Sequence, residues 1–374
     1  MLSSRLPTDA DDLTVADLNA VLAATAPGVS LVDFAVTESH LWGSGAASSA
    51  GRLVIEPQYT PGGAADLPRR LVVKVAKTDP QSDDPKQVRG TGALYRNEVD
   101  VYTRLRPADF LEAPRIFGAV YDPDTSTFLL VMEDLRDRGA TFGAATLPVE
   151  VESIRSLIGQ LSTLHARYWM GSGLAHPDWM EAHTRGDLHR IFNTPEAAPR
   201  FIAEQVANVQ FKREMVQRLG TTVEGLHAGF QRVQRHQAAL PQTICHGDTH
   251  IGNTYILPDG GGGLLDWQLT CTGYAMHDIS YLIATGLSVA DRRRYERDLL
   301  AEYREQLASK GVKDAPKLDE LWLEYGRALV WGVYIGWLTT PVVNYGWEIN
   351  VINHLRLMTA YEDLETGRLI QMLG

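Results

Sequence analysis

The chain has 374 residues, which is long for one hydrophobic core and fits two lobes or domains. Its hydrophobic content of 44% and charged content of 22% are ordinary for a globular enzyme and give no reason to expect disorder. The formal net charge of −11 disfavours binding to nucleic acid or to an anionic membrane surface, because both would repel the chain, and it mildly favours a neutral or cationic substrate.

The sequence also bears on location. Its first residues lack the apolar core of a signal peptide. The longest apolar run, residues 328–343, is about 16 residues long, short of the roughly 20 that span a bilayer. We therefore expect a cytoplasmic enzyme that does not contact a membrane. The two cysteines, Cys245 and Cys271, are expected to be buried free thiols in a reducing compartment.

The N-terminal region predicts a helix followed by a strand. Thr14 precedes the apolar pattern VADLNAVLAA and is a typical helix cap, and Pro27 and Gly28 predict the end of that helix. Residues 31–38 alternate apolar and polar side chains, as a half-buried strand does.

Residues 41–57 then predict a hairpin with a loop of small residues. Gly43, Gly45 and Ser48 stand where a Gly-x-Gly-x-x-Gly pattern has its glycines, so the third glycine is missing. Small residues let a backbone approach phosphates closely and offer its amides as donors. An ordinary hairpin turn accounts for the same residues equally well.

A lysine and a glutamate stand at apolar positions of two neighbouring predicted elements. Residues 69–77 predict a central strand on which Lys74 shares one face with Val72 and Ala76. Residues 91–105 predict a helix in which Glu98 lies on an otherwise apolar stripe. A buried ammonium needs a partner, so we expect Lys74 to pair with Glu98. The alternative is a lysine that extends from a strand edge into solvent.

Beyond a buried apolar strand at residues 127–135, the pattern becomes mostly helical. Residues 148–170 show the 3.6-residue periodicity of a core helix, and we expect His165, beside its apolar stripe, to be structural. Further along, Asp278 is expected to cap one helix, and Ser288 with Asp291 to cap the next.

The stretch CHGDTHIGNTYILPDGGGGLLDW, residues 245–267, carries the chemistry. Asp248 and Asn253 lie five residues apart in a polar loop, and a predicted hairpin then brings Asp266 to the end of its second strand. Phosphoryl transfer needs a carboxylate that orients the attacking hydroxyl and accepts its proton, with an amide and a second carboxylate that hold magnesium. Magnesium prefers such oxygen ligands. The spacing equals that of the protein-kinase catalytic loop.

At these residues the chain resembles the aminoglycoside phosphotransferase-like kinases, and within them it looks closest to the ecdysteroid-kinase-like group. The residues that carry the resemblance are His246, Gly247, Asp248, His250, Gly252, Asn253, Asp266, Trp267, Gln268 and Asp278. The resemblance implies an α+β, two-lobed protein-kinase-like fold that uses ATP and magnesium to phosphorylate a small-molecule hydroxyl. Gln268 replaces the glycine of the protein-kinase Asp-Phe-Gly triplet, which argues against a protein substrate.

The resemblance also implies a domain layout and further site residues. Residues 1–132 would form a β-rich N-lobe, residues 133–138 a hinge, and residues 139–374 a mostly helical C-lobe with the catalytic loop and the acceptor site. The backbone near Glu133 and Leu135 would read adenine, and Lys74, fixed by Glu98, would contact the phosphates.

Two other interpretations of the catalytic stretch remain. His246 and His250 could suggest a zinc-dependent hydrolase, although glycines interrupt any helix and no glutamate follows the first histidine. The turn PDGGGG lacks the lysine and hydroxyl residue of a phosphate-binding loop, so we interpret it as a flexible turn.

The C-terminal region is rich in aromatic residues that could form an acceptor wall or simply a core: Trp322, Trp331, Tyr334, Trp337, Tyr345 and Trp347. The leading hypothesis is an ATP- and Mg²⁺-dependent small-molecule kinase. The alternatives are an aminoglycoside kinase specifically, or a kinase-like protein that binds nucleotide without catalysis. The sequence leaves the acceptor and the oligomeric state open.

Overall fold

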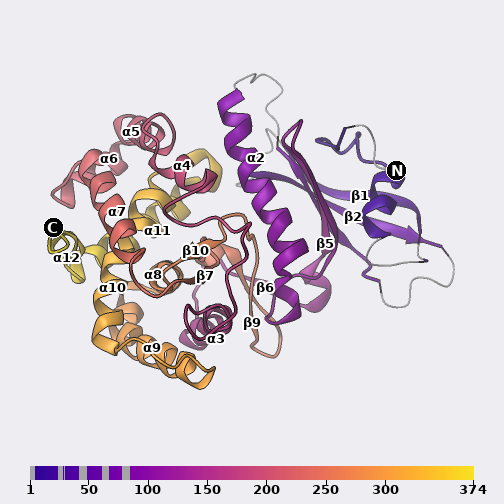
Figure 1. Cartoon of the computed structure of the whole chain (residues 1–374). Helices are drawn as coiled ribbons and strands as arrows, with labels where there is room; N and C mark the ends of the chain where they lie inside the picture. The colour runs from indigo at the N-terminus through magenta and orange to yellow at the C-terminus, as the bar shows by residue number, and fades with distance from the viewer. Residues whose placement is uncertain (1–4, 24–27, 29, 42–48, 61–66, 78–84) are drawn as a thin grey trace. The chain divides into compact units, whose positions relative to one another are not determined.

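The computed structural model describes the chain except for residues 1–4, 24–27, 29, 42–48, 61–66 and 78–84. The chain divides into two compact units, Met1–Thr141 and Phe142–Gly374 (Figure 1). The first contains a β-sheet and the second is mostly helical, which confirms the predicted α+β class. Among the described residues, none of the helices combines the length and apolar character that crossing a bilayer requires.

The first unit is built on a five-stranded antiparallel sheet in the order β1-β2-β3-β5-β4. Its strands are β1 (Leu31–His40), β2 (Ala50–Tyr59), β3 (Leu71–Ala76), β4 (Ile116–Asp122) and β5 (Thr127–Glu133). Helix α1 spans Val15–Leu22, and the preceding Thr14 caps it, as predicted. The Thr14 side chain accepts a hydrogen bond from the Asp17 amide. Strand β1 is mostly exposed because it forms an edge of the sheet, so the half-buried alternation expected there was wrong.

The two faces of β3 differ as the alternation predicts. Leu71, Val73 and Val75 are fully buried in the core under the sheet, and Lys74 lies on the opposite face. Helix α2 (Pro85–Asp100) packs against β4 and β5 (Figure 1). It continues as a short π-helix, η1 (Val101–Leu105). The short 3-10 helices η2 (Pro107–Asp109) and η3 (Leu135–Arg138) complete this unit.

The second unit packs helices around a buried central helix, α8 (Met276–Gly286), which is buried along its whole length. Helix α10 (Leu318–Trp331) packs against α7, α8 and α11 (Figure 1). The remaining helices are α3 (Val151–Arg167), α4 (Asp187–Asn193), α5 (Ala198–Asn208), α6 (Gln210–Arg218), α7 (Val223–Gln237), α9 (Val289–Ser309), the π-helix η5 (Gly332–Trp337), α11 (Val342–Asp363) and α12 (Thr366–Gln371).

Short strands hold the catalytic stretch on this helical framework. Strand β7 (Thr243–Cys245) pairs with β10 (Cys271–Gly273), and the hairpin of β8 (Thr254–Ile256) and β9 (Gly262–Leu264) is extended by β6 (Thr141–Phe142). The loop between β7 and β8 includes a turn of 3-10 helix, η4 (Ile251–Asn253). The predicted hairpin is confirmed, and both cysteines are buried free thiols as expected.

Candidate active site

The loop between β7 and β8 brings Asp248 and Asn253 together. The Asn253 Nδ2 atom donates hydrogen bonds to the Asp248 backbone oxygen at 2.9 Å and to its Oδ2 atom at 3.0 Å. Asn253 is thereby held with its amide nitrogen turned toward the loop. The five-residue spacing therefore closes the loop through a side-chain contact.

His246 connects this loop to the strand that precedes Asp266. Its Nδ1 atom accepts from the Asp248 amide at 3.2 Å, so its Nε2 atom must carry the proton that it donates to the Leu265 carbonyl oxygen at 3.1 Å. Burial lowers the pKa of His246, which favours this neutral form. The histidine is part of the scaffold, because its two hydrogen bonds fix the loop between β7 and β8 relative to β9.

Gly247 allows the loop to pack directly on the backbone of residue 269. Its φ angle is +91°, and a Cβ atom there would lie 2.1 Å from the Leu269 carbonyl oxygen. No other residue fits without displacing that backbone.

Asp278 holds the loop between β7 and β8 through hydrogen bonds to its backbone. It lies inside the first turn of α8, where its Oδ2 accepts from the His246 amide at 2.6 Å and its Oδ1 from the Gly247 amide at 2.9 Å. The predicted capping role was therefore wrong, because both carboxylate oxygens serve the catalytic loop. His165 of α3 contacts Asp278 Oδ2 through Nε2 at 3.1 Å and Tyr303 through Nδ1 at 2.8 Å, a structural role as expected.

The charge of Asp278 is maintained despite its burial. Burial raises the pKa of a carboxyl group, but the hydrogen bond from His165 and the electrostatic effect of that ring lower the pKa of Asp278 to about 2. Hydrogen bonds from two amides also favour the charged form. A permanent carboxylate therefore holds the backbone on which Asp248 is carried.

Asp266 follows β9 and has left-handed backbone geometry, with a φ angle of +65°. Aspartate tolerates this region better than most residues, and the turn directs the chain into the fully buried Trp267. The Trp267 ring lies 4.5 Å from that of His246. Asp266 is thereby fixed at the end of a strand whose partner begins one residue after Asn253.

Asp266 lies close enough to Asp248 for its charge to act on the Asp248 carboxyl group. Burial and the negative charge of Asp266 raise the pKa of Asp248 to about 8. Two carboxylates brought together in a buried site are destabilised as a pair of anions, and a divalent cation would relieve that repulsion. The oxygen donors of Asp266 and Asn253 therefore fit a magnesium ion in both chemistry and charge.

The first unit contains the predicted ion pair. Lys74 Nζ donates to Glu98 Oε1 at 2.6 Å and to Oε2 at 2.7 Å, and the two side chains are only 12% and 2% exposed.

Tyr95, which the sequence analysis did not identify, connects α2 to the sheet. Its ring stacks on Phe128 at 4.4 Å and its hydroxyl donates to the Ser49 carbonyl oxygen at 2.6 Å.

Comparison with known proteins identifies the family. A profile of the phosphotransferase enzyme family matches residues 65–321. The chain belongs to this family. Its membership confirms the predicted enzyme class, a small-molecule kinase, and the predicted aminoglycoside phosphotransferase-like relationship. The closer resemblance to ecdysteroid-kinase-like proteins stays a prediction.

A solved structure supports the fold of this phosphotransferase. The chain is similar to a choline kinase from Cryptosporidium parvum, with 12% identity, a TM-score of 0.54 and coverage of 91% of each chain. It also matches the choline kinase LicA from Streptococcus pneumoniae, with 14% identity, a TM-score of 0.48 and coverage of 88% of this chain and 94% of LicA. A comparison with curated protein sequences finds no match.

The predicted nucleotide-binding segments of the phosphotransferase are only partly described. Gly43, Gly45 and Ser48 lie outside the described residues. The Glu133 side chain accepts from the Arg115 amide at 2.8 Å. Leu135 is buried, and its carbonyl oxygen accepts from the Ala140 amide at 3.2 Å. The boundary between the units, after Thr141, lies C-terminal to the proposed hinge.

The zinc interpretation has no support among the described residues. Both ring nitrogens of His246 bond to the protein, and His250 Nδ1 accepts from the Gly252 amide at 3.1 Å. The one cluster there with ligand-like spacing is His165, Cys245 and Asp278. In this cluster, His165 Nδ1 bonds to Tyr303 and Nε2 bonds to Asp278, so both ring nitrogens are already used within the protein.

The C-terminal aromatic residues divide into core and candidate acceptor wall. Trp331, Tyr334 and Trp337 are buried in the core of the second unit, whereas Trp347 is 57% exposed. Tyr345 is close enough to the catalytic stretch that, after burial, the charges of Asp248 and Asp266 raise its pKa. The sequence left open whether Tyr345 belongs to an acceptor wall or to the core, because no sequence pattern relates residues so far apart in the chain.

Proposed function

We propose that this phosphotransferase moves the terminal phosphate of ATP to a hydroxyl group of a small molecule, with magnesium as its cofactor. The observation that carries the proposal is the arrangement of Asp248, Asn253 and Asp266 on one hairpin and its preceding loop. This set of oxygen donors suits phosphoryl transfer, where catalysis depends on positioning and on charge stabilisation.

Asp248 would orient the acceptor hydroxyl and accept its proton. Its loop is held by three independent connections, to Asn253, to His246 and through the backbone to Asp278. Such support keeps a catalytic carboxylate within the narrow geometry that proton transfer requires. Asn253 and Asp266 would hold magnesium, which when bound supplies positive charge to the phosphate oxygens.

Residues of the first unit would bind the nucleotide. Lys74, fixed by both oxygens of Glu98, would contact phosphate oxygens. The backbone near Glu133 and Leu135 would read adenine, and the loop with Gly45 and Ser48 would cover the phosphates. In this proposal residues 1–132 form the N-lobe, residues 133–138 the hinge and residues 139–374 the C-lobe.

The test is ATP-dependent ADP release with a pooled library of sugars, amino alcohols, aminoglycosides and apolar alcohols. Asp248→Asn should lower the acceptor-dependent rate by about 10² to 10⁴, the typical contribution of a general base. Asp259→Asn is the matched control, because Asp259 lies in the exposed turn of the same hairpin. If the Asp248→Asn variant releases ADP at the wild-type rate, the proposal is contradicted. If aminoglycosides are the only members of the library that stimulate ADP release, the result supports the alternative that the protein is an aminoglycoside kinase.

A further inference from the structure

His250 precedes η4 and caps this short helix with one side of its ring. The Nδ1 atom accepts a hydrogen bond from the Gly252 amide at 3.1 Å, so Nδ1 carries no proton and the neutral ring has its proton on Nε2. Among the residues that the structure describes, none forms a hydrogen bond with Nε2. One ring nitrogen therefore serves the fold, and the other offers an N–H group.

The Nε2 atom of His250 lies beside the proposed catalytic base, 4.0 Å from Asp248 Oδ2. That distance is too long for a direct hydrogen bond, but an oxygen atom about 2.8 Å from each of the two atoms would complete two ordinary hydrogen bonds. The two side chains are 11% and 15% exposed, so neither is sealed from solvent. Asn253 Nδ2 donates to the same Asp248 oxygen at 3.0 Å, which leaves that oxygen a second lone pair.

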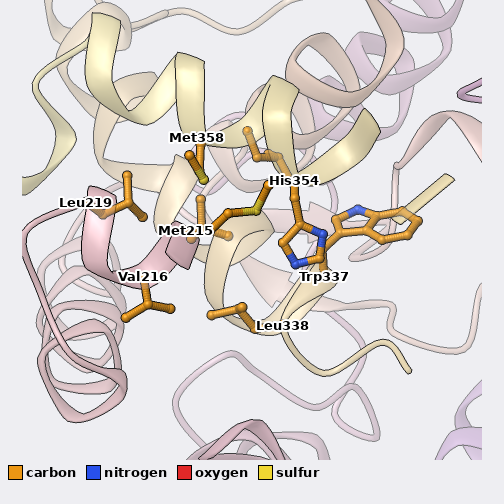
Figure 2. Close-up of a pocket in the computed structure, with 9 residues that line it drawn as sticks. Met215, Val216, Leu219, Trp337, Leu338, His354 and Met358 are labelled. Carbon is orange, nitrogen blue, oxygen red and sulfur yellow. The ribbon is translucent and has the colours of Figure 1, made fainter. Parts of the chain in front are cut away.

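Aromatic side chains hold the His250 ring in this position. Its centre lies 5.9 Å from that of Tyr281 on α8 and 6.0 Å from that of Trp337 in η5. The Trp337 ring packs in turn against His354 of α11, with 6.4 Å between the ring centres (Figure 2). These contacts oppose rotation of the His250 ring, so its N–H group stays beside Asp248.

The position of Trp337 is set by further contacts. The buried Lys212 ammonium donates to the carbonyl oxygens of Trp337 and Leu338, at 3.3 and 3.1 Å. Tyr345 packs against Trp337 with 5.6 Å between the ring centres. After the larger effect of burial, the charge of Asp248 raises the pKa of Tyr345. The rings that support His250 therefore extend to the neighbourhood of Asp248.

The position between His250 Nε2 and Asp248 Oδ2 suits the oxygen of an acceptor hydroxyl. A hydroxyl group has one proton to donate and two lone pairs. If the proton is donated to Asp248 and one lone pair accepts from His250, the second lone pair is left to attack phosphorus. A carboxylate alone would leave the hydroxyl able to turn about its own hydrogen bond, and a second contact removes that freedom. Such positioning supplies most of the catalysis in phosphoryl transfer.

We propose that His250 is a catalytic residue that orients the acceptor, because its Nε2–H donates a hydrogen bond to the hydroxyl oxygen that Asp248 deprotonates. The inference rests on the proposed function and adds to it the group that directs this oxygen. As the oxygen bonds to the terminal phosphorus of ATP, its proton passes to Asp248. The bond from that phosphorus to the bridging oxygen breaks, and its electron pair leaves with ADP. His250 keeps its own proton throughout.

Two variants separate this role from the capping of η4. His250→Asn retains an oxygen that can accept from the Gly252 amide, because asparagine is a good cap, but its N–H groups do not reach the Nε2 position. His250→Gln has the opposite balance, because its longer side chain brings an N–H group to that position. We expect kcat/KM for the acceptor to fall about three- to tenfold in His250→Asn, as for the loss of one hydrogen bond, and to fall less in His250→Gln.

The matched control is His176→Asn, because His176 is a half-exposed histidine whose ring bonds to the Tyr168 carbonyl oxygen. Its kcat/KM should equal that of the wild type, and the KM for ATP should stay unchanged in all three variants. If His250→Asn is as active as His176→Asn, or more active than His250→Gln, the proposal is overturned.

A deoxy analogue shows whether His250 contacts the hydroxyl directly. The probes are the library alcohol with the highest kcat/KM and the analogue in which hydrogen replaces its phosphorylated hydroxyl. Calorimetry measures the binding of each in the presence of magnesium and a non-hydrolysable ATP analogue. His250→Asn should weaken the alcohol about three- to tenfold and leave the deoxy analogue unchanged, because the latter has no oxygen for Nε2 to bond. Equal weakening of both probes would make the effect of His250 structural and overturn the proposal.

Failure of this inference can be told apart from failure of the proposed function. If the wild type phosphorylates no alcohol, the proposed function fails and this inference fails with it. If transfer depends on Asp248 but His250→Asn matches His176→Asn in both kcat/KM and alcohol affinity, the inference fails alone.

Discussion

Single residues show most clearly what a sequence pattern can reveal. Lys74 and Glu98 were each out of place on an apolar face, and together they form the buried ion pair that their periodicity predicted. Asp278 was among the residues that carry the family resemblance, but only the structure shows that it holds the backbone amides of His246 and Gly247. The Asp278 carboxylate accepts hydrogen bonds from backbone amides 31 and 32 residues away, and such contacts leave no periodic signal in the chain.

Breaking the ion pair should destabilise the first unit. Glu98→Gln leaves the Lys74 ammonium without its anionic partner. Removing one partner of a fully buried pair costs roughly 3 to 5 kcal/mol, and the partial exposure of Lys74 places the expected loss near or below the lower value. Urea unfolding measures it. Glu112→Gln, which breaks the half-exposed pair with Arg138, should cost less than about 1 kcal/mol, and equal losses would contradict the assignment.

Asp278→Asn should impair catalysis through the position of the loop. The variant retains one oxygen acceptor and introduces an NH₂ group opposite a backbone amide. We expect kcat to fall at least about tenfold with little change in the KM for ATP. Asp291→Asn, at the start of α9, is the control and should leave kcat unchanged. A normal kcat in a folded Asp278→Asn protein would show that the loop does not need this carboxylate.

At the scale of elements, helices and strands with strong periodicity were predictable, and irregular elements were not. The core helix α3 and the hairpin β8–β9 follow directly from their patterns. The π-helices η1 and η5 and the break in α11 at Gly346 did not, because these distortions depend on packing between helices. The burial of strand β1 was also predicted wrongly, because alternation of apolar and polar residues does not show which strand lies at the edge of a sheet.

Gly247 provides a test of how closely the catalytic loop packs on its neighbour. Gly247→Ala adds a Cβ atom 2.1 Å from the Leu269 carbonyl oxygen and also disfavours the positive φ angle. Gly260→Ala isolates the second effect, because Gly260 has a φ of +86° with open space around its Cβ position. We expect about 1 kcal/mol of destabilisation for Gly260→Ala and clearly more for Gly247→Ala, measured by urea unfolding. If both variants lose the same stability, the loop around Gly247 can move away from Leu269 without cost, and the close packing is contradicted.

At the scale of the whole molecule, the length of the chain predicted two units, and the family resemblance implied the α+β class that the structure shows. The packing around the C-terminal aromatic residues could not be predicted from the sequence. Trp337, Tyr345 and Lys212 come from different elements, and only the packing of the second unit brings them to one region. Composition alone could not distinguish a core tryptophan from one beside a substrate.

Buried neutral histidines should make the protein sensitive to acid. The pKa of His354 is about 3 in the folded state and about 6.5 when unfolded, so the unfolded state binds more protons below pH 6.5. The contribution of His354 to stability is therefore present above pH 6.5 and is lost as the pH falls toward 3, by about 1.4 kcal/mol per pH unit. Urea unfolding between pH 7 and 4 should show a shallower decline in His354→Gln than in the wild type. Parallel curves would contradict the buried neutral ring.

The most direct test of the central claim is transfer of a radiolabelled terminal phosphate from ATP to an alcohol at increasing magnesium concentrations. The wild type should form labelled product in a magnesium-dependent manner, and Asp266→Ala should form almost none at any magnesium concentration while remaining folded. The control variant Asp259→Asn should match the wild type. Undiminished transfer by Asp266→Ala would show that this carboxylate does not hold the metal, and the account of the site would be wrong.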